Sequence, residues 1–291
     1  MEMRRTSELR KIGREKRMIK VGHLFCLVAI LTSAVFLKGA VFAAADFVVP
    51  LELEVPDVVG VSAGVVPDYE GSDDYMFGAL PALNLQFENR HIRLLGSYLE
   101  VNILNHDALQ FGPIARYRFG RDEDIEDKVI KEIHQVDDSF EVGAFAGFLI
   151  RDNQNPRIRY GASLSYLQDV SDGHDGFTIQ ASARAWYPVS KAIDLGIAGG
   201  GTYASDDYMS AYFDVTGEDS ISTPLPVYDA EEGLKDVYIQ PMLMVHLSKS
   251  WHLGAGIRIK SLLSDAKNSP VVDDRGSDMQ VIAGVGVAYA W

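Results

Sequence analysis

The sequence has 291 residues, with 27 Lys and Arg against 41 Asp and Glu, 47% hydrophobic residues and a single Cys. This length allows one large domain or two small ones, and the apolar content excludes a disordered chain. The formal net charge of −14 argues against nucleic acid as a partner, because a phosphate binder needs clustered basic residues. One Cys excludes a disulfide scaffold and a multi-cysteine zinc site.

The N-terminal segment differs from the rest of the chain in charge and hydropathy. Basic residues come first, the apolar run 21–37 follows, and small residues fill 39–45. This order is typical of a secretory signal peptide. We therefore expect residues 1–45 to be removed, with cleavage near Ala43 or Ala45, and residues 46–291 to form a single domain.

Two alternatives concern this segment. Met18 is an alternative start, because it would leave a conventional short basic region before the apolar run. The apolar run also approaches the length of a membrane-spanning helix, although the small residues after it favour cleavage over anchoring.

The rest of the chain alternates between apolar and small or polar residues, which indicates β-strands. In the last segment, Val281, Ala283, Val285 and Val287 share one face, and Gln280, Gly284 and Gly286 share the other. Long strands with one large apolar face and a small or polar opposite face are typical of a transmembrane barrel with a polar interior. A soluble sandwich obeys the same period of two and is the alternative.

Strands are expected in twelve segments, which together predict an all-β, antiparallel transmembrane barrel. They are 58–66, 76–87, 91–95, 98–104, 108–119, 139–151, 157–168, 176–187, 192–204, 236–247, 251–262 and 279–291. Treating 91–104 as one strand would give an odd number, so we divide it at Gly96-Ser97, because bacterial single-chain barrels have even counts. Ten strands are the alternative count.

The connections between these strands alternate in length. Short turns at 88–90, 105–107, 152–156, 188–191 and 248–250 alternate with the mostly longer segments 67–75, 120–138, 169–175, 205–235 and 263–278. Outer-membrane barrels have short periplasmic turns and long extracellular loops. The longest segment, 205–235, contains aromatic residues and prolines, so we expect a folded lid or partner surface rather than a loose tether.

Several motifs resemble those of one known family. The segment after the first strand reads Val65-Val66-Pro67-Asp68-Tyr69-Glu70-Gly71-Ser72-Asp73-Asp74-Tyr75, and further motifs lie at 118–124, 206–213, 228–236 and 269–277. The chain resembles the MipA/OmpV family of outer-membrane proteins, named for an MltA-interacting protein, from about residue 57 to its end. We define Pro67 to Ser72 as the family-motif loop.

The resemblance implies a scaffold between a lytic transglycosylase and a peptidoglycan (murein) synthase, with adhesion in some relatives. We therefore expect a non-enzymatic interaction protein of the cell outer membrane, in contact with outer-membrane lipid. A small anion-preferring pore and a surface adhesin acting through the external loops are the alternatives.

Acidic pairs fall in the predicted external loops and are weak candidates for binding divalent cations. They include Asp73, Asp74, Asp206 and Asp207. Carboxylates suit calcium or magnesium, but none of the pairs has the spaced ligands of a calcium loop. Solvation of the barrel mouth is the favoured interpretation, so no metal or other cofactor is expected.

A set of basic residues is expected to line the lumen, because their neighbours on the alternate face are apolar. The set is Arg116, Arg118, Arg159, Arg184, Arg258 and Lys260. Charges of one sign favour ions of the other in a pore. The competing interpretation is that these residues pair with Glu141 and with acidic loop residues that fold inward, which would rigidify or plug the barrel.

The sequence contains no convincing catalytic constellation. His246 and Ser248 are the one close Ser-His pairing, and both are expected on the lumen side at the periplasmic end. A lipid hydrolase of the outer leaflet would need its nucleophile on the lipid side, with a base and an oxyanion site. We therefore expect no catalytic residues.

The final strand carries a pattern of its own. Val285, Val287, Tyr289 and Trp291 occupy alternate positions and end in an aromatic residue. This pattern resembles the C-terminal signal read by the outer-membrane assembly machinery, and an aromatic anchor at the membrane interface is compatible with it.

Overall fold

The computed structural model describes residues 57–122 and 125–291. The predicted signal peptide, with Ala43 and Ala45, therefore lies outside the described residues, and its cleavage stays a prediction.

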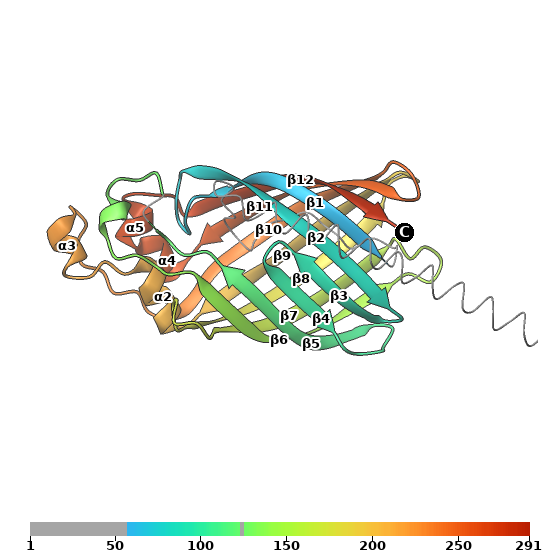
Figure 1. The fold of residues 1–291 in the computed structure, drawn as a ribbon, viewed down its shortest axis with the longest axis horizontal. Coiled ribbons are helices and arrows are strands. Elements are labelled where there is room, and N and C mark those ends of the chain that lie inside the picture. The colour runs from blue at the N-terminus through green and yellow to red at the C-terminus, as the bar shows by residue number, and fades with distance from the viewer. Residues whose placement is uncertain (1–56, 123–124) are drawn as a thin grey trace, which may run out of the picture. The chain divides into compact units, whose positions relative to one another are not determined.

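The described residues form twelve antiparallel strands that close into a barrel (Figure 1). They are β1 (Val58–Pro67), β2 (Tyr75–Phe87), β3 (Arg90–Leu95), β4 (Tyr98–Asn102), β5 (Leu109–Arg118), β6 (Ser139–Arg151), β7 (Arg159–Asp169), β8 (Phe177–Pro188), β9 (Ile193–Ala204), β10 (Gly233–His246), β11 (Trp251–Leu262) and β12 (Met279–Ala290). Each strand pairs with its neighbour in sequence, and β1 pairs with β12 from Val58–Ala290 to Val65–Ala283. Closure pairs the backbone groups that an open sheet edge would leave free.

The two faces of the wall match the predicted alternation. Val285 is 65% exposed and Leu164 is 54% exposed on the outer face, whereas Gln280 is 1% exposed and Ile282 is 2% exposed on the inner face. A large apolar outer face and a polar or small inner face suit a barrel that contacts lipid outside and holds polar groups inside. The expected all-β barrel of about twelve strands is confirmed.

The division at Gly96-Ser97 is also confirmed. Leu95 pairs with Tyr98, and Gly96 has a φ of +58°, which suits glycine in a two-residue turn. Three boundaries were wrong by two residues or more. The strand expected at 98–104 ends at Asn102, and the strand expected from 157 begins at Arg159. The strand expected from 236 begins at Gly233, because a register shift between Leu234 and Asp236 extends its pairing with β9.

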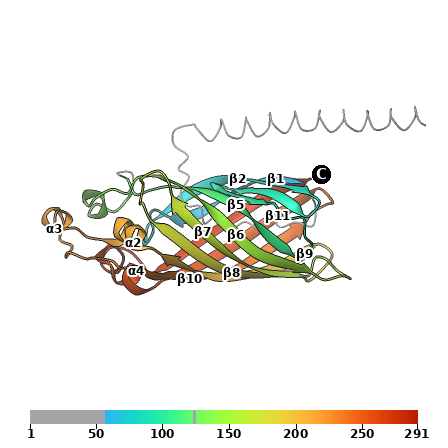
Figure 2. The ribbon, with the colours of Figure 1, turned by 90° about the horizontal axis from the view of Figure 1, so that it is seen from below.

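The connections gather at two ends that we name by their length (Figure 2). The short-turn end holds residues 88–89, 103–108, 152–158, 189–192 and 247–250. The long-loop end holds 68–74, 119–122, 125–138, 170–176, 205–232 and 263–278, with the short helices η1 (Ile130–Glu132), α2 (Asp206–Phe213), α3 (Asp219–Ser222), α4 (Ser264–Asn268) and α5 (Pro270–Asp273). By the usual pattern of outer-membrane barrels, the long-loop end faces outward from the cell.

Within the described ranges, no helix is long and apolar enough to cross a membrane. The largest clusters of buried apolar side chains lie at the long-loop end, between the loops and the adjoining rim of the wall.

Candidate functional site

The family-motif loop is held tightly against the inner rim of the barrel. Gly71 donates its backbone N–H to Oε1 of Gln280 at 3.3 Å, and Nε2 of Gln280 donates to the carbonyl of Ser72 at 3.0 Å. Gly71 has a φ of +102°, a region that favours glycine. A Cβ at this position would lie 2.6 Å from Cγ2 of Val272, so the loop requires a glycine both for its backbone conformation and for its packing.

Glu70, the next residue toward the N-terminus, is the centre of a buried ion-pair network. Its carboxylate pairs with Lys235 and, at 2.8 Å, with Lys260, while Tyr208 donates its hydroxyl to Oε2 at 2.6 Å. Burial alone would raise the pKa of Glu70, but the two ammonium groups outweigh it and hold that pKa well below its ordinary value. The loop is therefore pinned to strands that lie 165 and 190 residues further along the chain.

Helix α2 supplies the apolar part of the same closure. Residues four apart lie on one helix face, so Tyr208 and Tyr212 stack with ring centroids 4.6 Å apart. Tyr208, Met209 and Phe213 are 0% exposed. They pack in a cluster with residues of the rim and of neighbouring loops, which are Val136, Ala204, Ala230, Leu262, Ala266 and Val272.

A second apolar cluster lies among the same loops. It contains Tyr69, Ile125, Ile130, Ile133, Val215, Leu225 and Val271. Polar contacts join its segments: Arg275 pairs with Asp127 at 2.5 Å, and Asp219 accepts from the backbone N–H of His134 at 2.7 Å. We call the interlocked residues 68–74, 119–122, 125–138, 205–232 and 263–278 the plug.

Glu141 anchors the wall next to the plug. Its carboxylate accepts hydrogen bonds from Arg116 and, at 2.8 Å, from Arg118, and His174 lies 3.0 Å away. The Nδ1 atom of His174 accepts from the N–H of Gly176 at 3.1 Å, which leaves Nε2 to donate to Glu141. The guanidinium of Arg118 also lies 5.1 Å from the ring centroid of Tyr208, so the wall and the plug share this residue.

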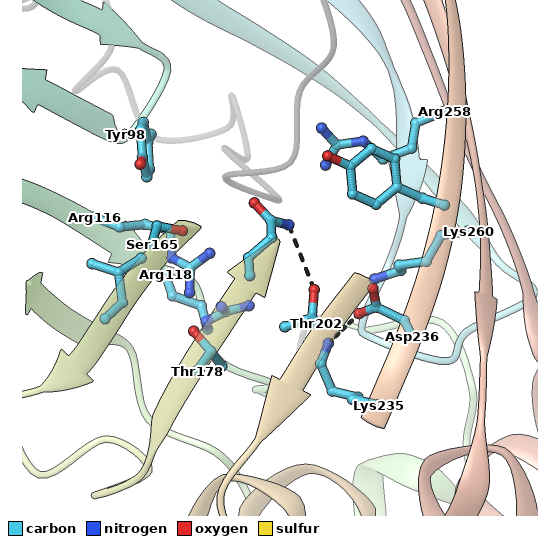
Figure 3. Close-up of a pocket in the computed structure, with 13 residues that line it drawn as sticks. Tyr98, Arg116, Arg118, Ser165, Thr178, Thr202, Lys235, Asp236, Arg258 and Lys260 are labelled. Carbon is cyan, nitrogen blue, oxygen red and sulfur yellow. Dashed lines mark hydrogen bonds and ion pairs between the residues drawn. The ribbon is translucent and has the colours of Figure 1, made fainter. Parts of the chain in front are cut away.

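Beneath these contacts the lumen contains a small polar pocket that is open to solvent (Figure 3). Five basic residues line it, and they are Arg116, Arg118, Lys235, Arg258 and Lys260. The neutral lining residues are Tyr98, Ser165, Leu167, Thr178, Gln180, Thr202 and Tyr238, all polar except Leu167. Asp236 is the one acidic residue among the described lining residues, so the pocket is strongly basic.

The predicted lumen residues therefore fall into different surroundings. Arg116, Arg118, Arg258 and Lys260 line the pocket. Arg159 instead lies with its guanidinium 5.0 Å from the ring centroid of Trp186, and Arg184 lies on β8, outside the pocket lining. Glu70 is a loop acid that folds inward and pairs with Lys260, as the second interpretation of these residues expects. Arg116 and Arg118 pair with Glu141.

Sequence reasoning missed the basic partner of Glu70. Lys235 falls in the loop expected at 205–235, whereas the structure places it on β10 with a buried side chain. The sequence did contain one indication of a special role for Lys235, because it is the one basic residue between positions 205 and 236.

The weak metal candidates are not gathered into a cluster of possible ligands within the described residues. Asp73, Asp206 and Asp207 are exposed. No group of three or more His, Cys, Asp or Glu residues that could hold a metal ion occurs in residues 57–122 and 125–291.

The Ser-His pairing has a structural role at the turn between β10 and β11. Ser248 accepts from the N–H groups of Ser250 and Trp251 at 3.1 and 3.0 Å, which stabilises the turn. His246 contacts Asp194 at 3.0 Å and His252 at 2.7 Å.

The residues of the C-terminal pattern lie on the outer face of β12 and at its end. Val285 and Tyr289 are exposed, and the ring of Tyr289 lies 5.1 Å from that of Trp251 and 6.4 Å from that of Trp291. Aromatic residues in this position suit a membrane interface. Recognition by the assembly machinery stays a prediction.

A closed barrel with an apolar outer face, short turns at one end and long loops at the other defines an outer-membrane barrel protein. The sequence matches the family described as "MltA-interacting protein MipA" over residues 59–291. The chain belongs to this MipA family, which confirms the resemblance drawn from its motifs.

Two solved structures illustrate the wider comparison. An outer membrane channel from Pseudomonas putida F1 is 12% identical, with a TM-score of 0.46, and the match covers 86% of this chain and 100% of that one. The NanC porin is 13% identical, with a TM-score of 0.46, and the match covers 80% and 100%. No curated protein matches the sequence. Likenesses at this level do not identify what the present chain binds or conducts.

Proposed function

We propose that this outer-membrane barrel is a non-enzymatic interaction scaffold, which holds periplasmic partners at its short-turn end. The observation that carries the proposal is the plug, because a mouth filled by two buried apolar clusters and the Glu70 network favours a fixed platform over an open pore. The family description names interaction with MltA. In line with the family resemblance, the partners that we propose for this chain are a lytic transglycosylase and a peptidoglycan synthase.

The short-turn end has the properties that a docking surface needs. Asn89 donates from Nδ2 to Asn105 at 3.1 Å and to Asp107 at 3.0 Å, and Asn105 donates to Glu88 at 2.7 Å. These bonds tie two neighbouring turns together. A surface that is ordered before binding loses less conformational entropy when a partner docks.

Charge reversal at this end tests the proposal. Lys191 and Lys249 are exposed in two short turns, whereas Lys128 and Lys131 are exposed at the opposite end. Purified barrel carrying Lys191→Glu and Lys249→Glu should capture less transglycosylase and synthase than wild type, and the Lys128→Glu, Lys131→Glu variant should match wild type. Capture of neither enzyme by the wild-type barrel would reject the scaffold.

The same plug gives an expectation for the pore alternative. Planar-bilayer recordings of the full chain should show no steady conductance above bare lipid, because the loops occupy the mouth. A stable, anion-selective conductance would instead favour the pore.

One observation favours adhesion as a second candidate. Helix α3 lies farthest from the strands in both views (Figures 1 and 2), and Ile221 on it is 87% exposed, with Val227 downstream 63% exposed. Exposed apolar side chains on a projecting loop suit contact with another surface. Ile221→Ser with Val227→Ser should reduce binding of expressing cells to a host-cell layer, and unchanged binding would count against this role.

A further inference from the structure

We propose that the short-turn end contains a pH-sensitive latch, in which His246 and His252 hold neighbouring turns together at neutral pH and separate in acid. The latch is a property of the barrel alone. Its effect on partner capture rests on the proposed scaffold role, and exchange measured on the free barrel tests the latch without that role.

A chain of four polar side chains crosses the wall at this end. Arg157, in the turn 152–158, pairs with Asp194 at 2.5 Å, and Asp194 lies 3.0 Å from Nε2 of His246. His246 and His252 are directly opposed on β10 and β11, with their Nδ1 atoms 2.7 Å apart. Asp194 is 2% exposed and His252 is 4% exposed. We call these four residues the latch, because they join the turn 152–158 to the turns 189–192 and 247–250.

The contacts of the latch limit how many protons its two imidazole rings can hold. A carboxylate only accepts hydrogen bonds, so Nε2 of His246 must donate to Asp194. Between the two Nδ1 atoms, one must donate and the other must accept, because a hydrogen on both would place two donors against each other. The closed latch therefore holds at most three protons on its four ring nitrogens, whereas two separated imidazolium rings hold four.

Acid should therefore favour separation of the rings, because the open latch binds one proton more than the closed latch. Below the ordinary His pKa of about 6.5, each pH unit should shift the equilibrium toward the open latch by up to about tenfold. The charged groups nearby are Asp194, Arg157 and Lys249 in the adjoining turn, and β12 places Ala288 beside His252. Asp194 alone cannot balance Arg157 and two charged rings, so repulsion adds to the separation.

Separation of the two rings should loosen the adjoining turns. The N–H of His246 donates to the carbonyl of Ala192 at 2.7 Å, and the N–H of Leu247 donates to the carbonyl of Trp251 at 3.0 Å. Both bonds flank the latch residues. Lys191 and Lys249, whose charge reversal tests partner capture, lie in the same two turns. Partner capture through this surface should therefore weaken in acid.

Hydrogen exchange of the purified full chain in detergent micelles tests the latch at pH 7.5, 6.5, 5.5 and 4.5. Protection factors, which correct for the intrinsic pH dependence of exchange, should be constant down to about pH 6.5 in residues 189–192 and 246–250. Below that pH they should fall by up to about tenfold per pH unit. Protection in strand β2, on another part of the wall, should not change.

Two variants separate the latch from other effects of acid. His252→Gln keeps a side chain that can donate to or accept from His246 but that takes up no proton, so protection of these turns should no longer depend on pH. His106→Gln is the matched control, because His106 is exposed in the short turn 103–108 and is not part of the latch. This variant should keep the wild-type response.

Unchanged protection of the turns in the wild type from pH 7.5 to pH 4.5 would reject the latch. The same holds if folded His252→Gln keeps the wild-type response, and heat-dependent gel mobility shows whether the variant has folded into a barrel. If it does not fold, NMR of the wild type with nitrogen-15-labelled histidine decides. Protonation of both rings must then coincide with the loss of protection, and full protonation with protection unchanged would reject the latch.

Capture of transglycosylase and synthase at pH 7.5 and pH 5.5 tests the regulation. The wild-type barrel should capture less at pH 5.5, whereas His252→Gln should capture equally at both. Equal capture by the wild type at both pH values would reject the regulation. Capture at neither pH would reject the scaffold role and the regulation with it, while the exchange measurements would still decide the latch.

Discussion

The two ends of the barrel are closed by different means. At the long-loop end, segments more than 100 residues apart in sequence meet in apolar clusters and in the Glu70 ion pairs. At the short-turn end, each turn is stabilised by side chains from the same turn or its neighbour, as Ser248 does for Ser250 and Trp251. The loops at the long-loop end therefore depend on tertiary packing, whereas the turns at the short-turn end depend mainly on hydrogen bonds within a turn or between adjacent turns.

The largest expected effect comes from removing an apolar anchor of the plug. Phe213 is fully buried, so Phe213→Ala should destabilise the plug by about 3–5 kcal/mol through lost packing and a cavity. Hydrogen exchange should speed up in residues 205–232 while the strands stay protected. The control is Leu247→Ala in a short turn, since Leu247 is 60% exposed. Equal exchange in the two variants would contradict the difference between the ends.

The next effect comes from neutralising Glu70. Glu70→Gln leaves Lys235 and Lys260 beside a neutral amide. It should destabilise the loop contact by about 3 kcal/mol, the lower end of the range for breaking a buried ion pair. Limited proteolysis at the family-motif loop measures it. Glu88→Gln at the short-turn end removes the charge of an exposed side chain but keeps an oxygen that can accept from Asn105, so it should have little effect.

The pH dependence of the same contact has a definite sign. The folded pKa of Glu70 lies well below its ordinary value of 4.5. Its stabilising contribution is therefore complete above that ordinary pKa and is lost as the pH falls through the lower, folded pKa. In the wild type, protection of the family-motif loop from proteolysis should stay constant from pH 7 to pH 5 and should fall only at lower pH. In Glu70→Gln this fall at low pH should be absent. Loss of wild-type protection already between pH 7 and pH 5 would contradict the ion pairing.

A smaller effect is expected at Gly71. Gly71→Ala should destabilise the loop by about 1–3 kcal/mol, because alanine is strained at this φ, and the added Cβ meets Val272. Adding Val272→Ala should relieve the collision but leave the backbone strain. Gly217 is the control, because a Cβ there meets no atom within 4 Å. Thermal unfolding followed by loop proteolysis distinguishes the three variants.

The smallest effect is expected at Asp219, on the short helix α3 of the plug. Burial alone would raise the pKa of Asp219, but hydrogen bonds from His134 and Thr216 lower it to about 2. Its contribution is thus present above the ordinary value of 3.8 and is lost as the pH falls through about 2. Hydrogen exchange near α3 should accelerate only below about pH 4, and Asp219→Asn should remove this dependence. Acceleration at pH 5 or 6 would indicate another group.

The contrast between the ends also explains how much the sequence could predict. The strands were predictable because alternation is local, as the opposite faces of Val285 and Gln280 illustrate. The inward direction of Arg116 followed from the same rule. The loop helices and the pairing of Glu70 with Lys235 were not predictable, because helices this short form only with tertiary support. No local pattern links residues 165 positions apart.

The short hairpin of β3 and β4 has a consequence for the surrounding bilayer. These strands have six and five residues, whereas the other strands have ten to fourteen. The outer part of β2, from Tyr75 to Leu80, pairs with β1, and its pairing with β3 begins only at Ala82. Six tilted residues rise roughly 15 Å, less than the apolar band of about 25 Å around such barrels. The barrel wall at β3 and β4 is therefore shorter than the apolar layer of the membrane. The resulting hydrophobic mismatch should thin the outer leaflet there, and this asymmetry should give the barrel a preferred orientation toward neighbouring proteins.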